Sequence, residues 1–304
     1  MIKLLRNLLM GLLPLTSMGQ TVTDGLMMAK NDLCTGVMYT RDHWSEYWEG
    51  ELKRKNDNIG KLTTQSLMWV GAYGLSTKVN LIAMLPYVKT EASQGTLHHM
   101  EGIQDLTLAV KYNFFRHNME KSSFRTFATL AVSTPLSDYT PDYFPLSVGT
   151  GTTNISYRAT AFYKFANMFF ANATGAYTWR SNTTLDRPAY YTNDNLYLTD
   201  EVKMPNVFDY AVSIGYLRNG LQAEINYMQQ NTLGGSDIRR QDMPFVSNRM
   251  NFSKVGALVM YYLPKPKGLA LRGSYTTTVA GRNVGQSNTF MGGALYTIHF
   301  SKKP

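Results

Sequence analysis

The 304-residue sequence contains a single cysteine, so no disulfide can form within the chain. Charge is also scarce, because Asp, Glu, Lys and Arg make up only 17% of the residues. After residue 20, no apolar run approaches the roughly 18 to 20 residues that a transmembrane helix requires. These absences exclude a disulfide-stabilised scaffold and a helical membrane protein. The mean hydropathy of -0.24 fits strands that show one face to lipid and the other to water.

Residues 1–19 have the features of a secretory signal peptide. Lys3 and Arg6 form a basic start, an apolar middle follows, and Ser17 and Gly19 form a small-x-small cleavage site. We therefore expect residues 1–19 to be removed on export and residues 20–304 to form one β-barrel domain. Export also argues against nucleic acid as a partner, although the formal net charge of the chain is +9.

Apolar and polar residues alternate along much of the remaining chain, which is the pattern of a β-strand with two different faces. In the segment 102–115, Leu106, Leu108 and Val110 point one way, whereas Asp105 and Thr107 point the other. The apolar face of such a strand must contact lipid or a large core.

About twelve stretches of this kind predict an all-β fold, a membrane-spanning up-and-down antiparallel β-barrel. The predicted strands span about residues 34–43, 62–73, 79–90, 102–115, 123–135, 153–165, 168–180, 206–218, 221–232, 251–263, 268–280 and 289–300. Short connections follow the even-numbered strands, and one of them is Asn219-Gly220, a strong hairpin signal. Long polar connections follow the first five odd-numbered strands. This sorting fits tight turns at a periplasmic rim and long loops outside the cell.

Aromatic residues gather near the two ends of the predicted strands. The set next to the short turns is Tyr73, Phe114, Phe165, Phe169, Tyr216, Tyr261 and Phe300, and the opposite set is Tyr87, Tyr177, Trp179, Phe208 and Tyr227. Two such belts are typical of a barrel at its two membrane interfaces, whereas a soluble β-sandwich would scatter aromatics through its core. The lone Cys34 is expected to be a small buried side chain at the start of the first strand.

Residues suited to catalysis or metal binding form no recognisable pattern. The five histidines are His43, His98, His99, His117 and His299, and they match neither a zinc spacing nor a catalytic triad. His98 and His99 are adjacent in a predicted loop and should point apart, while His299 should face inward alone. The acidic residues of the long loops lack the spacing of a calcium-binding EF-hand. We therefore expect no enzyme activity, no metal site and no cofactor.

Charged residues of the predicted strands fall on the inward face, because charge on the lipid face is costly near the membrane midplane. Successive residues of a strand point to opposite faces, so the position of a residue in this alternation, its parity, tells whether it points inward. Parity gives nine candidate pore-lining residues: Lys111, Arg125, Arg158, Arg180, Lys254, Arg272, Asp105, Asp209 and Glu224. Arg125 and Arg158 are expected near mid-height on neighbouring strands. Cations outnumber acids in this set, and an excess of Lys and Arg in a pore favours anions. The alternative is that these charges pair with one another and only brace the barrel.

Three stretches carry a resemblance to a known family. The strand that opens with Gly102–Leu108 and closes with Lys111-Tyr112 resembles the Gly-x-x-Asp-hydrophobic strand of the outer-membrane channels named after the meta pathway of phenol degradation. The preceding Leu85–Val88 and the following Ser133–Tyr139 are in the places that this family would put them. The resemblance implies a barrel that transports small or hydrophobic compounds. Similarity to the fourteen-stranded fatty acid transporters is more distant, and no clear N-terminal plug is expected.

These observations together indicate an outer-membrane, porin-like channel or transporter that passes small solutes into the periplasm, with small hydrophobic or anionic compounds as candidates. The alternative is a closed barrel whose long outer loops bind a ligand or partner or have a structural role. An outer-membrane hydrolase is the third hypothesis. The expected location is the outer membrane of a Gram-negative cell. Expected partners are outer-membrane lipid, lipopolysaccharide, the barrel-assembly machinery and a small-molecule solute, but no nucleic acid.

The last predicted strand generates a test of assembly. Tyr296, Ile298 and Phe300 form an outward apolar row that resembles the C-terminal signal read by the barrel-assembly machinery. Phe300→Ala should therefore lower the amount of assembled barrel several-fold, whereas removal of residues 302–304 should have little effect. Comparing boiled and unheated samples on a detergent gel measures assembly. Equal assembly of the two variants would show that the signal lies elsewhere.

Overall fold

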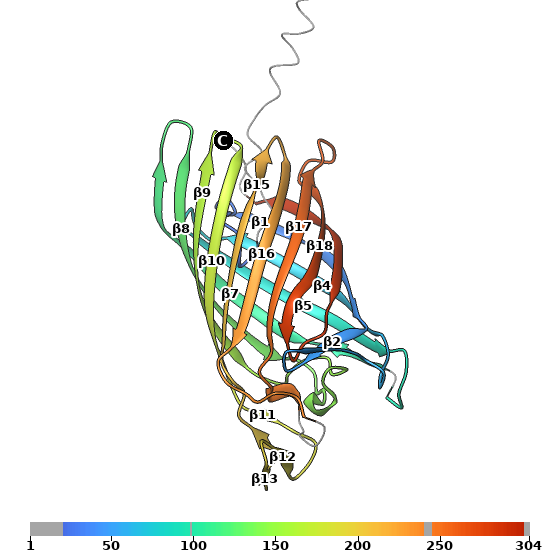
Figure 1. Cartoon of the computed structure of the whole chain (residues 1–304). Coiled ribbons are helices and arrows are strands. Elements are labelled where there is room, and N and C mark those ends of the chain that lie inside the picture. Colours follow the sequence, from blue (N-terminus) through green and yellow to red (C-terminus); the bar gives the residue numbers. More distant parts are fainter. Residues whose placement is uncertain (1–20, 98, 240–244, 301–304) are drawn as a thin grey trace, which may run out of the picture.

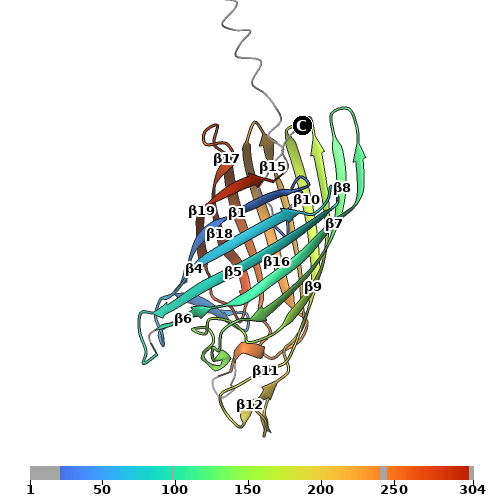
Figure 2. The same ribbon diagram turned by 180° about the vertical axis from the view of Figure 1, so that it is seen from behind.

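The computed structural model describes residues 21–97, 99–239 and 245–300, and these form a closed antiparallel barrel of tilted strands (Figure 1, Figure 2). The wall consists of β1 (Asp32–Trp44), β4 (Leu62–Gly74), β5 (Val79–Ala92), β7 (Asp105–Asn118), β8 (Ser123–Pro135), β9 (Asn154–Phe165), β10 (Phe169–Arg180), β15 (Val207–Arg218), β16 (Leu221–Thr232), β17 (Asn251–Tyr262), β18 (Leu269–Arg282) and β19 (Asn288–His299). The ring closes because β1 pairs with β19 on one side and with β4 on the other. The predicted twelve-stranded barrel is confirmed.

One predicted strand is divided in the structure. The stretch 102–115 belongs to β6 (His99–Ile103) and β7, which are separated by Gln104. The N–H of Gln104 donates to the carbonyl of Pro86 at 2.9 Å, at the point where β5 changes its partner from β7 to β6. Pro86 has no N–H to donate, so the ladder is interrupted at this rung. Every other predicted strand matches the observed one to within two residues at each end.

The connections at the two rims differ as predicted. Ala166 and Asn167, with φ of 49° and 56°, and Asn219 and Gly220, with φ of 54° and 77°, form tight turns at one rim, the short-turn end. Positive φ at both central residues suits the twist of the flanking strands. The opposite rim, the long-loop end, carries small hairpins and 3-10 helices. These are β2 (Glu46–Glu49), β3 (Leu52–Lys55), β11 (Thr183–Thr184), β12 (Tyr190–Thr192), β13 (Asn195–Tyr197), β14 (Glu201–Val202), η2 (Pro141–Tyr143) and η3 (Phe245–Ser247).

The barrel wall has an apolar outer face. On β7, the exposed Leu108, Val110 and Tyr112 alternate with the buried Ala109 and Lys111. Two apolar clusters lie on the inner side of the wall. One contains Met28, Cys34, Met38, Ala72, Ile82, Ala109, Leu258, Met260, Tyr262, Ala270 and Leu295, and the other contains Leu26, Phe127, Phe162, Phe170 and Leu217. The side chains inside the barrel therefore fill part of the lumen.

Residues 21–31, which we call the inner segment, precede β1 and lie inside the barrel. Leu26 packs with Phe162 and Phe170, while Met28 joins the other apolar cluster. At the short-turn end, the N–H of Asn31 donates to the carbonyl of Gly74 at 2.8 Å. The expectation of no clear N-terminal plug is therefore wrong. The position of the inner segment could not be predicted from the sequence, because neither a strand period nor a helix period extends through residues 21–31.

The described chain enters β1 and leaves β19 at the short-turn end. After β19, the N–H of Phe300 donates to the carbonyl of Asn31 at 3.0 Å, and the Phe300 side chain is exposed. The predicted signal peptide, His98 and residues 301–304 lie outside the described residues. In the described part of the chain, no helix has the length and apolar character needed to cross a membrane.

Candidate functional site

The candidate site is the barrel lumen together with its outer mouth. All nine charged residues projected inward from the sequence occupy positions that alternate with the exposed outer face of their strands. What parity does not specify is how each charge is neutralised. The partners come from the inner segment, from neighbouring strands and from one long loop.

Lys111 is completely buried and contacts the inner segment. Its Nζ lies 2.9 Å from Oδ1 of Asp24 and donates to the carbonyl oxygens of Thr21 at 3.1 Å and of Asp24 at 2.5 Å. The Phe127 ring centroid lies 5.1 Å from the same nitrogen, a cation–π distance. A buried ammonium without these partners would be strongly destabilising. Lys111 therefore anchors the inner segment at the middle of β7.

The inner segment turns around the Asp24 carboxylate. The N–H of Thr21 and the N–H of Leu26 donate to it at 2.5 and 3.0 Å. From the wall, Nδ2 of Asn172 donates to the carbonyl of Thr23 at 3.1 Å. Gly25 follows directly, and a Cβ at this position would lie 2.2 Å from the Phe162 side chain. Only glycine allows the backbone to approach the wall this closely.

Arg158 and Asp209 form a second ion pair inside the wall. Nη2 of Arg158 lies 2.8 Å from Oδ1 of Asp209, and Nη1 donates to Oγ1 of Thr174 at 3.3 Å. Arg158 pairs with Thr129 in the register of β9 and β8, which is near the middle of both strands. This pair therefore braces β9 against β15 across the intervening β10.

A residue of a long loop enters the mouth of the barrel beside two candidate residues. The hydroxyl of Tyr139 donates to Oδ1 of Asp105 at 2.5 Å, and Arg180 is an electrostatic neighbour of the same carboxylate. Burial, followed by the hydrogen bond to Asp105, raises the pKa of Tyr139. Tyr139 therefore remains a neutral donor, and its loop is held over the end of β7.

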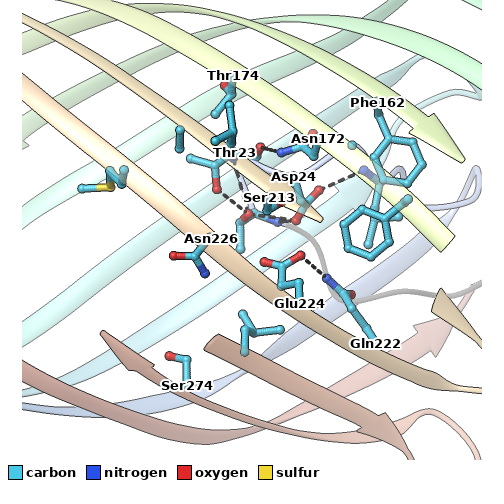
Figure 3. Close-up of a pocket in the computed structure, with 18 of the residues that line it drawn as sticks. Thr23, Asp24, Phe162, Asn172, Thr174, Ser213, Gln222, Glu224, Asn226 and Ser274 are labelled. Carbon is cyan, nitrogen blue, oxygen red and sulfur yellow. Dashed lines mark hydrogen bonds between the residues drawn. The ribbon is translucent and has the colours of Figure 1, made fainter. Parts of the chain in front are cut away.

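A cavity of about 310 Å³ lies between the inner segment and the wall around β15 to β18 (Figure 3). Its lining mixes polar residues, such as Ser213 and Asn226, with apolar residues such as Leu258. Arg272 also lines the cavity, and Asp24 and Glu224 are its acidic electrostatic neighbours. Gln222 donates from Nε2 to the Glu224 carboxylate at 3.3 Å. The volume is at the lower end of the range for small-molecule pockets.

The last two candidate cations have contrasting surroundings. Lys254 has Asp42 as its acidic neighbour and lies 4.9 Å from the ring centroid of Phe252. Arg125 instead pairs in register with Arg116 of β7, and its Nε is buried without a hydrogen-bond partner. Because Arg125 is close to the start of β8, the expectation of mid-height is wrong for this residue. It lies at the short-turn end.

The sequence projection missed several inward charges. Asp42 has the same parity on β1 as the buried Cys34 and Met38, so this signal was available. Asp24 lies before the first strand, where no parity applies. Two cations were missed as well, because Lys164 has the same parity on β9 as the buried Phe162 and a bulge in β7 turns Arg116 inward, and these cations offset the two acids.

Two of the six candidate cations, Lys111 and Arg158, form ion pairs that also position structural elements. Three others, Arg180, Lys254 and Arg272, have acidic electrostatic neighbours.

A larger cavity of about 890 Å³ lies under the loops at the long-loop end. Its lining includes aromatic residues, such as Trp44 and Phe144, and charged residues such as Arg54 and Asp57. The β2–β3 hairpin folds across this region, where the N–H of Trp48 donates to the carbonyl of Val284 at 2.9 Å. The outer loops therefore form a covered vestibule.

A charged network, which we call the outer latch, fastens the loops of this vestibule. Arg282 at the end of β18 donates twice to Asp237, at 2.8 and 2.6 Å, and once to Glu51, at 2.8 Å. Oδ1 of Asn283 accepts from the N–H of Gly50 at 2.7 Å. The hydrogen bond from Arg282 lowers the pKa of Asp237. Arg282 and Asn283 therefore hold two loops, those that contain Glu51 and Asp237, at the end of β18.

The histidines do not form a reaction centre in the described part of the chain. No group of three His, Cys, Asp or Glu side chains gathers there to hold a metal ion. His299 was expected to face inward alone, but its Nδ1 lies 2.8 Å from Oδ1 of the buried Asp32. Asp32 lies two residues before the predicted first strand, so the pairing of β1 with β19 was needed to find this contact.

Lys111→Met should release the inner segment, because Asp24 then loses the cation that neutralises it. In a Leu26→Cys background, where the wild-type side chain is buried, we expect labelling by a water-soluble maleimide to become roughly tenfold faster or more. Lys254→Met is the matched control, because this substitution also removes a lumen cation but Lys254 does not contact the inner segment. Equal labelling of the Lys111 and Lys254 variants would contradict the anchoring role.

The outer latch should weaken in acid. A depressed pKa means that the Asp237 carboxylate stabilises the folded loops above the ordinary value of about 4, and that this stabilisation is lost as pH falls through the lower folded value. Amide hydrogen exchange at Gly50, corrected for its intrinsic pH dependence, should therefore accelerate below about pH 4. Asp237→Asn should raise exchange roughly three- to tenfold at neutral pH and remove the acid dependence. An unchanged pH profile in this variant would contradict the latch.

Comparison with known proteins agrees with this geometry. Residues 60–292 match the family model described as "Putative MetA-pathway of phenol degradation". A crystal structure of an outer membrane channel from Pseudomonas putida F1 has a TM-score of 0.74 at 15% identity, with 93% of this chain and 100% of that chain covered. The transport unit of the autotransporter AIDA-I from Escherichia coli has a TM-score of 0.47 at 10% identity, with 93% of each chain covered. No curated protein sequence matches. Because the family model covers most of the chain, this protein belongs to the family of the putative MetA pathway of phenol degradation.

Proposed function

We propose that this protein is an outer-membrane channel that passes small, partly apolar solutes into the periplasm. The observation that carries the proposal is the 310 Å³ cavity beside the inner segment, because it is lined by both polar and apolar side chains. A solute with an apolar body and one polar group would satisfy both parts of this lining. The similar Pseudomonas putida F1 structure is also described as an outer membrane channel.

The direction of transport in this proposal follows from the asymmetry of the barrel. The short turns, the start of β1 and the end of β19 lie at one rim, and in outer-membrane barrels this is the periplasmic side. Solute would enter under the outer loops, reach the lumen and leave past the inner segment. The Lys111–Asp24 contact is the step that must loosen, since it anchors the segment beside the cavity.

A polar cluster on the outer face supports placement of the long-loop end in a lipid headgroup region. The hydroxyls of Tyr210 and Tyr227 donate to Oε1 of Gln229 at 2.7 and 2.9 Å, and Tyr227 also contacts Oγ of Ser253 at 3.1 Å. Tyrosine and polar side chains of this kind suit a membrane interface. Lipopolysaccharide and outer-leaflet lipid are the surroundings that this cluster fits, after export through the N-terminal signal peptide and insertion by the barrel-assembly machinery.

The second candidate function is a closed barrel that binds a ligand or partner through its outer loops. The 890 Å³ vestibule and the outer latch favour this alternative, because both lie in loops that a simple open pore would not require. The two functions differ in one measurable property. A channel conducts when the inner segment is released, whereas a closed binding barrel does not.

Conductance in a planar bilayer tests the proposal. The wild-type barrel should show brief, small openings, and Lys111→Met should lengthen or enlarge them several-fold because the inner segment is no longer anchored. Lys254→Met should behave like the wild type. Proteoliposomes should take up a small aromatic alcohol faster when they contain the Lys111 variant. Absence of conductance and uptake in all three proteins would overturn the channel and leave the closed binding barrel.

A further inference from the structure

Three cations lie together on the inward face at the short-turn end. Arg116 of β7 is directly opposite Arg125 of β8, and Lys164 of β9 is opposite Ser123, two residues from Arg125 along β8. Diagonal neighbours in a sheet have Cα atoms about 7 to 8 Å apart, within reach of long side chains. We call Arg116, Arg125 and Lys164 the exit cluster.

A bulge in β7 brings Arg116 into this cluster. The register of β7 and β8 shifts between Asn113 and Phe115, so Phe114 is an extra residue on the β7 side. An extra residue reverses the alternation beyond it. Arg116, which simple parity from Lys111 would place outward, therefore shares the face of Arg125.

No carboxylate forms an ion pair with the exit cluster in the described part of the chain, and none is an electrostatic neighbour of Arg125 or Lys164, whereas each of the other five candidate lumen cations has an acidic partner or neighbour. The electrostatic neighbour of Arg125 is Arg116, and those of Lys164 are Arg125 and Arg218. Nε of Arg125 is buried without a hydrogen-bond partner. Glu120, in the turn after β7, is exposed and forms no ion pair with the cluster among the described contacts. Like charges directly opposite in a sheet are destabilising, so an anion bound here would stabilise the wall.

An aromatic surface adjoins the cluster on the same face. Phe162 is opposite Arg125, Phe170 is opposite Lys164, and their ring centroids lie 5.4 Å apart. Both rings pack against Leu26 of the inner segment and also line the 310 Å³ cavity. The guanidinium and ammonium groups thus border an apolar surface that faces both the inner segment and the cavity.

We propose that the exit cluster binds the carboxylate of a small solute whose apolar body rests against Phe162 and Phe170. Guanidinium groups bind carboxylates through paired, charge-assisted hydrogen bonds, and the neighbouring ammonium adds charge. The inference rests on the proposed function, since the cluster lies where a solute would leave the lumen. It narrows the solute class to apolar carboxylates and gives the unpaired Arg125 a role.

Equilibrium binding to the purified, refolded barrel tests the inference, with benzoate, benzyl alcohol and inorganic phosphate as probes in isothermal titration. Benzoate should bind more tightly than either other probe, and its affinity should fall as salt is raised. Arg125→Gln and Lys164→Gln should each weaken benzoate binding about tenfold, the effect of losing roughly 1.4 kcal/mol. Lys254 is a lumen cation at the other end of the barrel, so Lys254→Gln should leave the affinity for benzoate unchanged. Gel mobility of unheated samples reports whether each variant is folded.

Each outcome is decisive. Equal benzoate affinity in the wild type and in a folded Arg125→Gln variant overturns the site, and so does equal binding of benzoate and benzyl alcohol. Equal binding of benzoate and phosphate overturns the apolar part of the assignment. Binding needs no conduction, so a barrel that conducts without binding benzoate overturns only this inference. A barrel that binds benzoate but never conducts overturns the proposed function.

Discussion

Backbone pairing between β1 and β19 is the interaction on which the rest of the structure depends. In a bilayer, an unpaired N–H or C=O has no water to bind, so a spanning sheet must close on itself. Closure fixes which face of every strand meets lipid and which face meets the lumen. The exposed apolar row of β7 and the inward position of Lys111 are both consequences of it. So is the contact of His299 with Asp32, which joins the two strands at the seam.

Because the barrel is closed, the candidate charged side chains of its wall strands point into the lumen. Other side chains fill part of the lumen, so these charges are only partly solvated. Lys111 is neutralised by Asp24 of the inner segment and Arg158 by Asp209 of the wall. Asp105 is bound by Tyr139 of an outer loop. The same contacts that neutralise charge therefore hold the segments that close the barrel from inside and from above. Electrostatics and access to the lumen are coupled through single side chains.

The strands could be predicted from the sequence because closure makes every second residue apolar over long stretches. Their ends were also predictable where turn chemistry is strong, as at Asn219-Gly220. The failures have local causes. Pro86 breaks the ladder and divides the stretch 102–115, and the bulge at Phe114 reverses the parity of Arg116.

The inner segment was the largest omission. Asp24 belongs to no periodic element, so its position depends on a lysine 87 residues away in the sequence. A similar limit applies to Arg125. Its inward direction follows from parity, but its lack of an acidic partner depends on which side chains three neighbouring strands bring together. The direction in which a side chain points is set by its own strand, whereas the partner that neutralises its charge depends on which strands the closed barrel brings together.

The position of the inner segment also constrains the order in which the protein assembles. Its contacts are with Lys111 of β7 and Asn172 of β10, and the latter is 149 residues from Thr23. The first described residues of the chain must therefore wait for strands that are synthesised and exported much later. The ring is closed by the last strand, and Asn31 lies at the rim beside Phe300. Docking of the inner segment and sealing of the wall are consequently late events at the same rim, so an incomplete barrel would lack both its seam and its interior closure.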